Sequence, residues 1–381
     1  MSIRDQLGGT VRFGYDLAGQ QTSLTDARGK SWSQTFDLLG GAKTTTDPLG
    51  RTTSMAYDTR GLLRTKTDEL GLAFTYGYDD AGQLTSLAGP TETVTYGYDA
   101  LGRRTTAIGG NGTLATAYDP VGRPTSFTTP SGTVGYAYDD AGRRTSMTTP
   151  SGTVGYGHDE ANRLTSLTPP GTAAIAFGYD RDSRLTSISR PNGLITTQSY
   201  DAAGRLSAIA HKRGSTVVDS FTYGLDANGN RTSVASPAGT ESYTLDALNR
   251  LTRAVYPGGR TVSYAYDGAG NRTSMTDGGT TTTYTYDDAG RLTAAGPIAL
   301  TYDAAGQRLT SGGDTFAWDW AGRLTSATVA GTTSTFGYDA DGLRASSTTG
   351  GTTAASLWDR AGAVPTLLSD GSATYLDANG I

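Results

Sequence analysis

The sequence repeats one short pattern along its length, and this repeat constrains the fold more than any other feature. Its clearest copy is T-V-G-Y-A-Y-D-D-A-G-R-R-T-S-M-T-T-P-S-G, from Thr133 to Gly152. Every copy contains an anchor, a mostly aromatic residue that is followed directly by Asp, from Asp16 to Asp377. The anchors are Tyr15, Phe36, Tyr57, Tyr78, Tyr98, Tyr118, Tyr138, His158, Tyr179, Tyr200, Leu225, Leu245, Tyr266, Tyr286, Tyr302, Trp318, Tyr338, Trp358 and Leu376. Most anchors lie 20 or 21 residues apart, and a fixed period of this size indicates a repeat architecture.

One period predicts a β-hairpin. Tyr136 and Tyr138 are two residues apart, so they lie on the same face of an extended strand that is rich in Tyr, Thr and Val. Asp139–Gly142 predicts a turn, because Asp side chains bond the backbone two residues on and Gly accepts a positive φ. Arg143–Met147 then alternates as a second strand, and Pro150–Gly152 predicts the turn that closes the unit.

The residue four positions after each anchor supports this interpretation. It is Gly in every copy except those with Asn162, Ser183 and Asn249. Asn is the next-best residue for a left-handed backbone, so two of these three departures follow the same rule.

The sequence therefore predicts an all-β fold, an array of consecutive antiparallel hairpins with about two strands per 20–21 residues and about 38 strands in total. At roughly 4.8 Å per strand the strip would be on the order of 180 Å long. Open twisted sheets rarely exceed about ten strands without curling. We expect a single array over residues 1–381, wound into a spiral that forms a hollow or partly open shell.

Three places depart from the regular period. The gap of 25 residues between Tyr200 and Leu225 predicts a lengthened, protruding turn that contains His211. The anchors Tyr286, Tyr302 and Trp318 are only 16 residues apart, which predicts shorter strands or turns. The sequence ends five residues after the last anchor, so we expect the array to continue, or to be capped by a partner or by itself.

Composition narrows the class of protein. The net charge is −5 with interspersed signs, which argues against nucleic acid or anionic membrane as a partner. Hydrophobic residues make up only 36%, so we expect a thin sheet with local packing. Cys is absent, and the N-terminus has no apolar signal-peptide core. The sequence contains no run of about 18 apolar residues, so it predicts no membrane span.

We assign no catalytic, cofactor-binding or metal-binding residue, and we expect no cofactor and no enzyme activity. A triad hydrolase would depend on one of the two histidines. His158 occupies an anchor position and is interpreted as an aromatic substitute, whereas His211 is interpreted as a solvated loop tip. Zinc sites of the Cys/His type and Cys nucleophiles are excluded by composition.

Several short matches to functional motifs are better explained by turn chemistry. They lack the full spacing of a phosphate loop or a calcium loop, or they coincide with the Asp-led turns. They are Gly29-Lys30-Ser31, the pairs Asp79-Asp80, Asp139-Asp140 and Asp287-Asp288, the segments Asp226–Asn230 and Asp339–Gly342, and the sequons at Asn111, Asn230 and Asn271.

The repeat x-Tyr-Asp-x-x-Gly-Arg-Leu-Thr-Ser resembles the YD repeat of Rhs-repeat proteins, which include bacterial Rhs polymorphic toxins, the shell component of insecticidal toxin complexes, and the teneurin YD shell. Its best copies are Tyr138–Arg143 and Tyr286–Thr293. The resemblance implies a strand strip that spirals into a cocoon, which in toxin-bearing members encloses a C-terminal toxin domain. It also implies a cargo polypeptide and a secretion or delivery machinery as partners, and a secreted or cell-surface location.

The sequence departs from this family pattern at its end. Family shells end in a conserved core, rich in Asp-Pro and Gly, that releases the toxin by aspartyl autoproteolysis. Here Asp-Pro occurs only at Asp47-Pro48 and Asp119-Pro120, inside ordinary repeats, and no toxin tail follows Ile381. Neither a toxin domain nor an autoprotease core is therefore assigned to these residues.

Two functional hypotheses remain open. The first is a non-catalytic shell, or a shell fragment, that encapsulates a toxin or other cargo. The second is an extracellular adhesion module whose Tyr-x-Tyr surface binds glycans or another protein.

Overall fold

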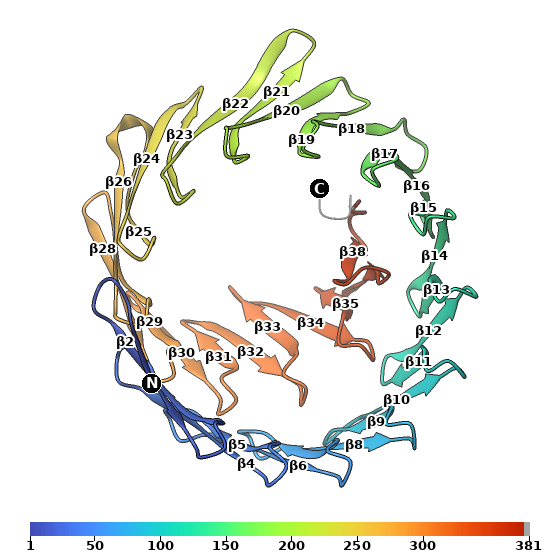
Figure 1. Ribbon diagram of the computed structural model, residues 1–381, viewed down its shortest axis with the longest axis vertical. Helices are drawn as coiled ribbons and strands as arrows, with labels where there is room; N and C mark the ends of the chain where they lie inside the picture. The colour runs from blue at the N-terminus through green and yellow to red at the C-terminus, as the bar shows by residue number, and fades with distance from the viewer. Residues whose placement is uncertain (377–381) are drawn as a thin grey trace. The chain divides into compact units, whose positions relative to one another are not determined.

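The computed structural model of the chain describes residues 1–376 and confirms the all-β prediction (Figure 1). These residues form 38 strands and one short 3₁₀ turn, η1 (Pro257–Gly259). Asp377 and Gly380, which belong to the last copy of the repeat, lie outside the described residues. Strands pair antiparallel with a neighbour in the sequence, as in β14 (Gly132–Tyr138) with β15 (Arg144–Thr149). The last two, β37 (Leu357–Asp359) and β38 (Thr366–Ser369), pair with each other in a separate sheet.

The chain divides into two compact units. Unit 1 consists of Met1–Leu114 and Tyr264–Ala355. The strands of its first strip are β1 (Ser2–Arg4), β2 (Thr10–Tyr15), β3 (Gln21–Thr25), β4 (Ser31–Phe36), β5 (Ala42–Thr46), β6 (Thr52–Tyr57), β7 (Leu63–Thr67), β8 (Ala73–Tyr78), β9 (Leu84–Ala88), β10 (Thr93–Tyr98) and β11 (Arg104–Gly109). Those of its second strip are β27 (Arg272–Asp277), β28 (Thr280–Tyr286), β29 (Leu292–Ala295), β30 (Ile298–Tyr302), β31 (Arg308–Ser311), β32 (Asp314–Trp318), β33 (Leu324–Val329), β34 (Thr332–Tyr338), β35 (Arg344–Thr349) and β36 (Thr352–Ala355).

Unit 2 consists of Ala115–Ser263 and the C-terminal segment that begins at Ser356. Besides β14 and β15, its strands are β13 (Pro124–Thr129), β16 (Gly152–His158), β17 (Leu164–Thr168), β18 (Ile175–Tyr179), β19 (Leu185–Ser189), β20 (Leu194–Tyr200), β21 (Leu206–Arg213), β22 (Thr216–Leu225), β23 (Arg231–Ser236), β24 (Gly239–Leu245), β25 (Leu251–Val255), β37 (Leu357–Asp359) and β38 (Thr366–Ser369). β12 (Gly112–Tyr118) and β26 (Thr261–Tyr266) contain the positions at which the sequence passes from one unit to the other.

The Asp-led turns have the predicted conformation. Gly142 has φ 83°, and its amide donates to the carbonyl of Asp139 at 3.0 Å. Asn162, Ser183 and Asn249 also have positive φ, between 61° and 63°, so Ser183 follows the rule as well. Gly362 is the exception among the described copies, because its φ is not positive.

The YD hairpins whose strand pairing is described also contain a β-bulge that the sequence pattern does not predict. In the copy at Tyr138, Ala137 pairs with Ser146 but Tyr138 pairs with Arg144, so Thr145 is an extra residue. The equivalent Thr186 donates its hydroxyl to the carbonyl of Gly178 at 3.1 Å. Such bulges bend a strand and increase its local twist, so the described repeats carry a curving element of their own.

The structure corrects one prediction and confirms another. The gap between Tyr200 and Leu225 is not a lengthened turn, because the added residues extend β21 and β22 to 8 and 10 residues. His211 therefore lies within β21, paired with Asp219, rather than at a loop tip. The strands between Tyr286 and Trp318 are short, as expected, with 4 residues each in β29 and β31.

The core is thin and local. In unit 2, residues of β14 to β17 form one cluster with Leu357 and Leu368 of the C-terminal hairpin, in which Met147 and Val134 are only 1% exposed. In unit 1 a smaller cluster includes Val94 and Leu114. The sheet therefore depends more on its backbone ladder and its turns than on a thick apolar interior.

Candidate functional site

The YD turn is a self-contained hydrogen-bonding unit, complete in the copy that starts at Asp159. One carboxylate oxygen of Asp159 accepts the backbone amides of Ala161 and Arg163, each at 3.0 Å. The other oxygen accepts Nε of Arg163 at 2.8 Å. These bonds favour the ionised carboxyl: the side-chain bond from Arg163, followed by its backbone amide, lowers the pKa of Asp159 below its ordinary value.

The same arginine connects its turn to the next repeat. Nη1 of Arg163 donates to the carbonyl of Asp180 at 3.1 Å, and its guanidinium lies 4.9 Å from the ring centre of Tyr179. The hydroxyl of Tyr179 donates back to the carbonyl of Leu164 at 2.8 Å. Each of the motif residues Tyr, Asp, Gly and Arg therefore has a structural task, and together they hold consecutive hairpins in line.

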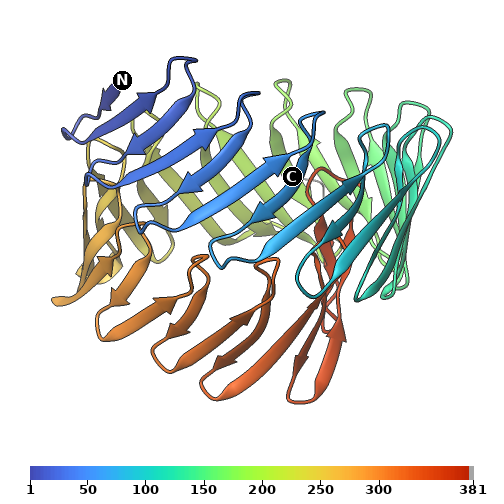
Figure 2. The ribbon, with the colours of Figure 1, turned by 90° about the horizontal axis from the view of Figure 1, so that it is seen from below.

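A second set of contacts joins the two strips of unit 1, which run alongside each other in Figure 2 (blue and orange). The YD turns of the second strip meet the opposite turns of the first strip. Arg28 donates to the carbonyl of Asp287 at 3.2 Å, and Arg51 donates to that of Ala304 at 2.8 Å. Further contacts are the ion pair of Lys30 with Asp288 at 2.7 Å, the tilted ring contact of Phe74 with Trp320, the ion pair of Arg323 with Glu92, and the bond from Asn111 to the carbonyl of Tyr338.

The first-strip turns in this contact are themselves Asp-led. Gly29 and Gly50 have φ of 82° and 77°, and Asp26 and Asp47 accept backbone amides in the same way as the motif aspartates. In unit 2 the corresponding turns have a different chemistry. There Pro150 packs against Gly132, whose φ of 135° and lack of a side chain leave room for the proline ring.

Unit 2 contains a buried polar contact between its sheet and its C-terminal hairpin. Asp359 forms an ion pair with Arg144, and the side chains of both residues are less than a tenth exposed. The hydroxyl of Tyr136 donates to Asp359 at 2.8 Å, and burial, followed by the nearby Asp359 charge, raises the pKa of Tyr136 above its ordinary value. Asp359 is the motif aspartate of its own repeat, but position 363, where the motif places Arg, holds Ala.

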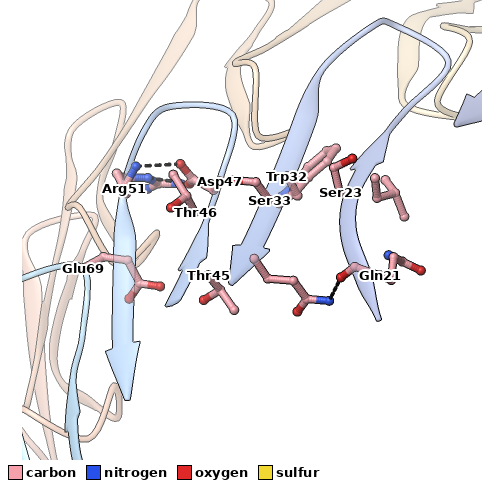
Figure 3. Close-up of a pocket in the computed structure, with 11 residues that line it drawn as sticks. Gln21, Ser23, Trp32, Ser33, Thr45, Thr46, Asp47, Arg51 and Glu69 are labelled. Atoms are coloured by element: carbon pink, nitrogen blue, oxygen red, sulfur yellow. Dashed lines mark hydrogen bonds and ion pairs between the residues drawn. The ribbon is translucent and has the colours of Figure 1, made fainter. Parts of the chain in front are cut away.

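An open groove of about 530 Å³ lies on the first strip of unit 1 (Figure 3). Trp32, Glu69 and the Asp47–Arg51 pair contribute to its lining, together with the side chains of Gln21 and Gln34. Glu69 accepts the hydroxyl of Thr53 at 2.6 Å, and Gln34 donates to the carbonyl of Gln21. The groove thus combines one indole ring with carboxylates and amides, a set of groups that can bind polyhydroxylated ligands.

The two histidines lie in different surroundings. His158 is half-buried at its anchor position, and burial, followed by the charge of Arg143, lowers its pKa. Nδ1 of His211 lies 3.0 Å from the hydroxyl of Thr196, and its ring packs edge-on against Phe221. His158 and His211 belong to different hairpins, β16 and β21.

The remaining short motifs take part in turns or in strip contacts. Asn230 and Asn271 use their side-chain amides to bond the motif aspartates Asp226 and Asp267, each at 2.9 Å. Asp341 binds Arg104, with nitrogen–oxygen distances of 2.7 and 2.8 Å. Over residues 1–376 no group of three or more His, Cys, Asp or Glu side chains is placed to hold a metal ion. In the same range no helix has the length and apolar character to cross a membrane.

Comparison with known families agrees with this geometry. The RHS repeat family matches residues 1–31, 57–92, 78–114, 118–154 and 179–216, and the teneurin YD-shell family matches residues 227–350. The chain resembles RHS-repeat and YD-shell proteins. This confirms the expected resemblance, and the YD array accordingly has the character of a shell-like structural module. A comparison with curated proteins finds no match.

Solved structures show the same YD-repeat fold. The TcdB2-TccC3-TEV crystal structure matches with a TM-score of 0.79 and 18% identity, over 97% of this chain and 22% of that one. The TcdB2-TccC3-Cdc42 complex matches with 0.77 and 19%, over 89% and 22%. The Photorhabdus luminescens Tc holotoxin pore with a TccC3-D651A mutation matches with 0.78 and 18%, over 89% and 21%. The YD array therefore spans about a fifth of these chains.

Proposed function

We propose that the chain is a non-catalytic shell, or a segment of one, that encloses a toxin or another cargo polypeptide. The observation that carries this proposal is the edge-to-edge contact in unit 1, where consecutive YD turns of one strip meet the turns of an earlier strip. Edges that join in this way extend a strip of hairpins into a wall. The bulge found in the described YD hairpins, such as β14–β15 and β16–β17, supplies the bend that a curved wall needs.

The proposal includes partners and a location. The similarity to Tc toxin chains supports a cargo polypeptide as a partner. A secretion or delivery machinery is included in the proposal only as an implication of the resemblance to Rhs-repeat proteins. The proposed location is outside the producing cell, as a secreted or cell-surface component, and the matches to the teneurin YD-shell family and to the Tc holotoxin support it.

Electron microscopy of the purified chain tests the enclosure directly. We expect a particle with a hollow or trough-shaped interior. A guest peptide with a protease site, fused after Ile381, should be cleaved more slowly than the same peptide free in solution. A solid particle, or equal cleavage of the fused and free peptides, would contradict the proposal.

The groove on unit 1 favours a second candidate function, the binding of a carbohydrate. Trp32 offers an apolar ring face beside Glu69, Asp47 and two glutamines, and sugars present C–H faces and hydroxyls to such groups. A glycan array should then show binding that is lost in Trp32→Ala and retained in Trp358→Ala, which changes a tryptophan outside the groove. Loss of binding in both variants, or in neither, would argue against the groove as a glycan site.

A further inference from the structure

Two hairpins of the chain have nearly the same sequence. Tyr136–Met147 in unit 2 and Tyr264–Met275 in unit 1 differ only where Asp140 is replaced by Gly268 and where Arg143 is replaced by Asn271. Equal sequences in equivalent hairpins place equivalent side chains on the same face, because strand side chains alternate.

The two hairpins build the same cradle around an arginine. The guanidinium of Arg144 lies 5.8 Å from the ring centre of Tyr136 and 4.6 Å from that of Tyr156. The guanidinium of Arg272 lies 5.9 Å from Tyr264 and 4.3 Å from Tyr284. Both arginines are therefore held between the tyrosine of their own hairpin and the tyrosine of the next one.

The cradle around Arg144 holds a carboxylate from another segment of the chain. Asp359 pairs with Arg144 and accepts the hydroxyl of Tyr136 at 2.8 Å. Leu357 of the same segment joins the apolar cluster that buries Met147 to 1% exposure. Asp359 thus binds the polar groups of this face, Arg144 and Tyr136. Leu357, two positions before it, covers the apolar part of the same face.

A second arginine with the same position in its repeat also receives a carboxylate. Arg104 lies 5.7 Å from the ring centre of Tyr96 and binds both carboxylate oxygens of Asp341, at 2.7 and 2.8 Å. A guanidinium that is stacked on a ring is held in place and presents its planar edge to a carboxylate, so both occupied positions use the same chemistry.

The cradle around Arg272 differs from these two in what it contacts. Within residues 1–376 no carboxylate lies within ion-pair distance of Arg272. Met275, the equivalent of the buried Met147, is only partly buried. At the hairpin that copies the sequence of the occupied site, Arg272 thus lacks, among the described residues, the ion pair that Arg144 makes, and Met275 lacks the near-complete burial of Met147.

We propose that the cradle formed by Tyr264, Arg272 and Tyr284 binds an aspartate side chain of a partner polypeptide, with a neighbouring aliphatic residue of the partner against Met275. The partner segment resembles Leu357–Asp359 in chemistry, because this chain binds that segment at the equivalent position. The inference goes beyond the proposed function, since the contact needs only an exposed strip and not an enclosed space.

The test uses the full chain and a cyclised peptide with the sequence of residues 357–369, which is β37, β38 and their connection. Binding is measured by calorimetry at low and at moderate salt. We expect Arg272→Gln to weaken binding roughly tenfold or more, because a charge-assisted bond is lost. The peptide carrying Asp359→Asn should be weakened to the same extent on the unchanged protein, and Arg272→Gln should no longer distinguish the two peptides.

Two controls separate this site from general charge and from misfolding. Arg308→Gln removes an exposed arginine that is stacked on the single ring of Phe316, and it should leave binding unchanged. Hydrogen exchange on the unchanged protein should show added protection at β27 and β28 when the peptide is present. Absence of binding, equal binding by Arg272→Gln, or protection at other strands alone would overturn the proposal.

Discussion

The residue that makes each YD turn possible is the one four positions after the anchor. A Cβ added at Gly142 would meet no atom within 4 Å, so the surroundings place no steric limit on this position. The constraint is the backbone itself, since a φ of 83° is unfavourable for a residue with a Cβ.

We therefore expect Gly142→Ala to destabilise the protein by about 1 kcal/mol through its backbone alone. Gly155→Ala is a matched control, because Gly155 lies in the adjacent hairpin with ordinary φ and normal contact distances. Urea unfolding of both variants measures the difference, and an equal loss of free energy in the two would contradict this account.

His158 makes the stability of the fold depend on pH, which a tyrosine at the same anchor position would not do. Its pKa is lowered in the fold by burial and then by Arg143, so protons bind more tightly to the unfolded chain. The contribution of His158 to stability is therefore fully present above the unfolded pKa of about 6.5 and is lost as the pH falls below it.

His158→Tyr should remove this dependence. As the pH falls from about 7.5 to about 5.5, the unchanged protein should lose stability relative to the variant. Thermal unfolding at both pH values measures this change in the difference. His211→Tyr serves as a comparison at the second histidine. A constant difference between His158→Tyr and the unchanged protein at the two pH values would show that His158 is not the titrating group.

At the scale of the hairpin, the sequence predicts what repeats within one copy and misses what joins separate copies. Alternation around Tyr136 and the Asp139–Gly142 turn specify the strands and the turn, because these depend on local backbone preferences. The pattern does not reveal the extra residue at Thr145, since a bulge changes the pairing of strands without changing their alternation. The interpretation of His211 as a loop residue is wrong because added residues can lengthen strands as well as turns.

The contacts between strips are the least predictable from sequence, for a physical reason. Lys30 and Asp341 lie in segments that resemble fragments of ligand loops, whereas in the fold they meet Asp288 and Arg104. Partners so distant in sequence are brought together by the path of the whole strip. The one local signal is the charge on the turns of the first repeats.

The arginine that links neighbouring hairpins should have a measurable effect on both of them. We expect Arg163→Gln to increase hydrogen exchange at the turn amides near Asp159 and also near Asp180, on the order of tenfold, because it removes bonds to both turns. Arg181→Gln, at an exposed position of the second turn, should change neither. Faster exchange at the Asp159 turn alone would show that the link between repeats contributes little.

At the largest scale that the structure describes, the two strips of unit 1 keep their contacts although their hairpins differ in length. Arg28 meets Asp287, and the next pair is Arg51 with Ala304, so the first strip advances by more residues than the second between contacts. Strand spacing in a sheet does not depend on strand length. Short strands such as β29 and β31 therefore occupy the same width along the strip as the longer strands opposite them.

A charge exchange tests this contact. Arg104→Asp places two carboxylates together and should weaken the attachment of the second strip by about 1 kcal/mol, the upper range for a partly exposed pair. Asp341→Arg in the same chain should restore part of the loss. Hydrogen exchange near Tyr338 reports the attachment, and equal exchange in the single and the double variant would show that the pair does not join the strips.

The turns with Arg28, Lys30 and Arg51 also distinguish two kinds of border on a YD array. Where the turns carry charged and donor side chains, these side chains bond to the other row of hairpins. In unit 2, by contrast, Pro150 of one turn packs against Gly132 of the preceding turn. A border of the first kind can therefore bind another row of hairpins, whereas at a border of the second kind the tips pack against each other. Exchanging the tip residues between the two borders should therefore relocate the seam along which rows of hairpins join.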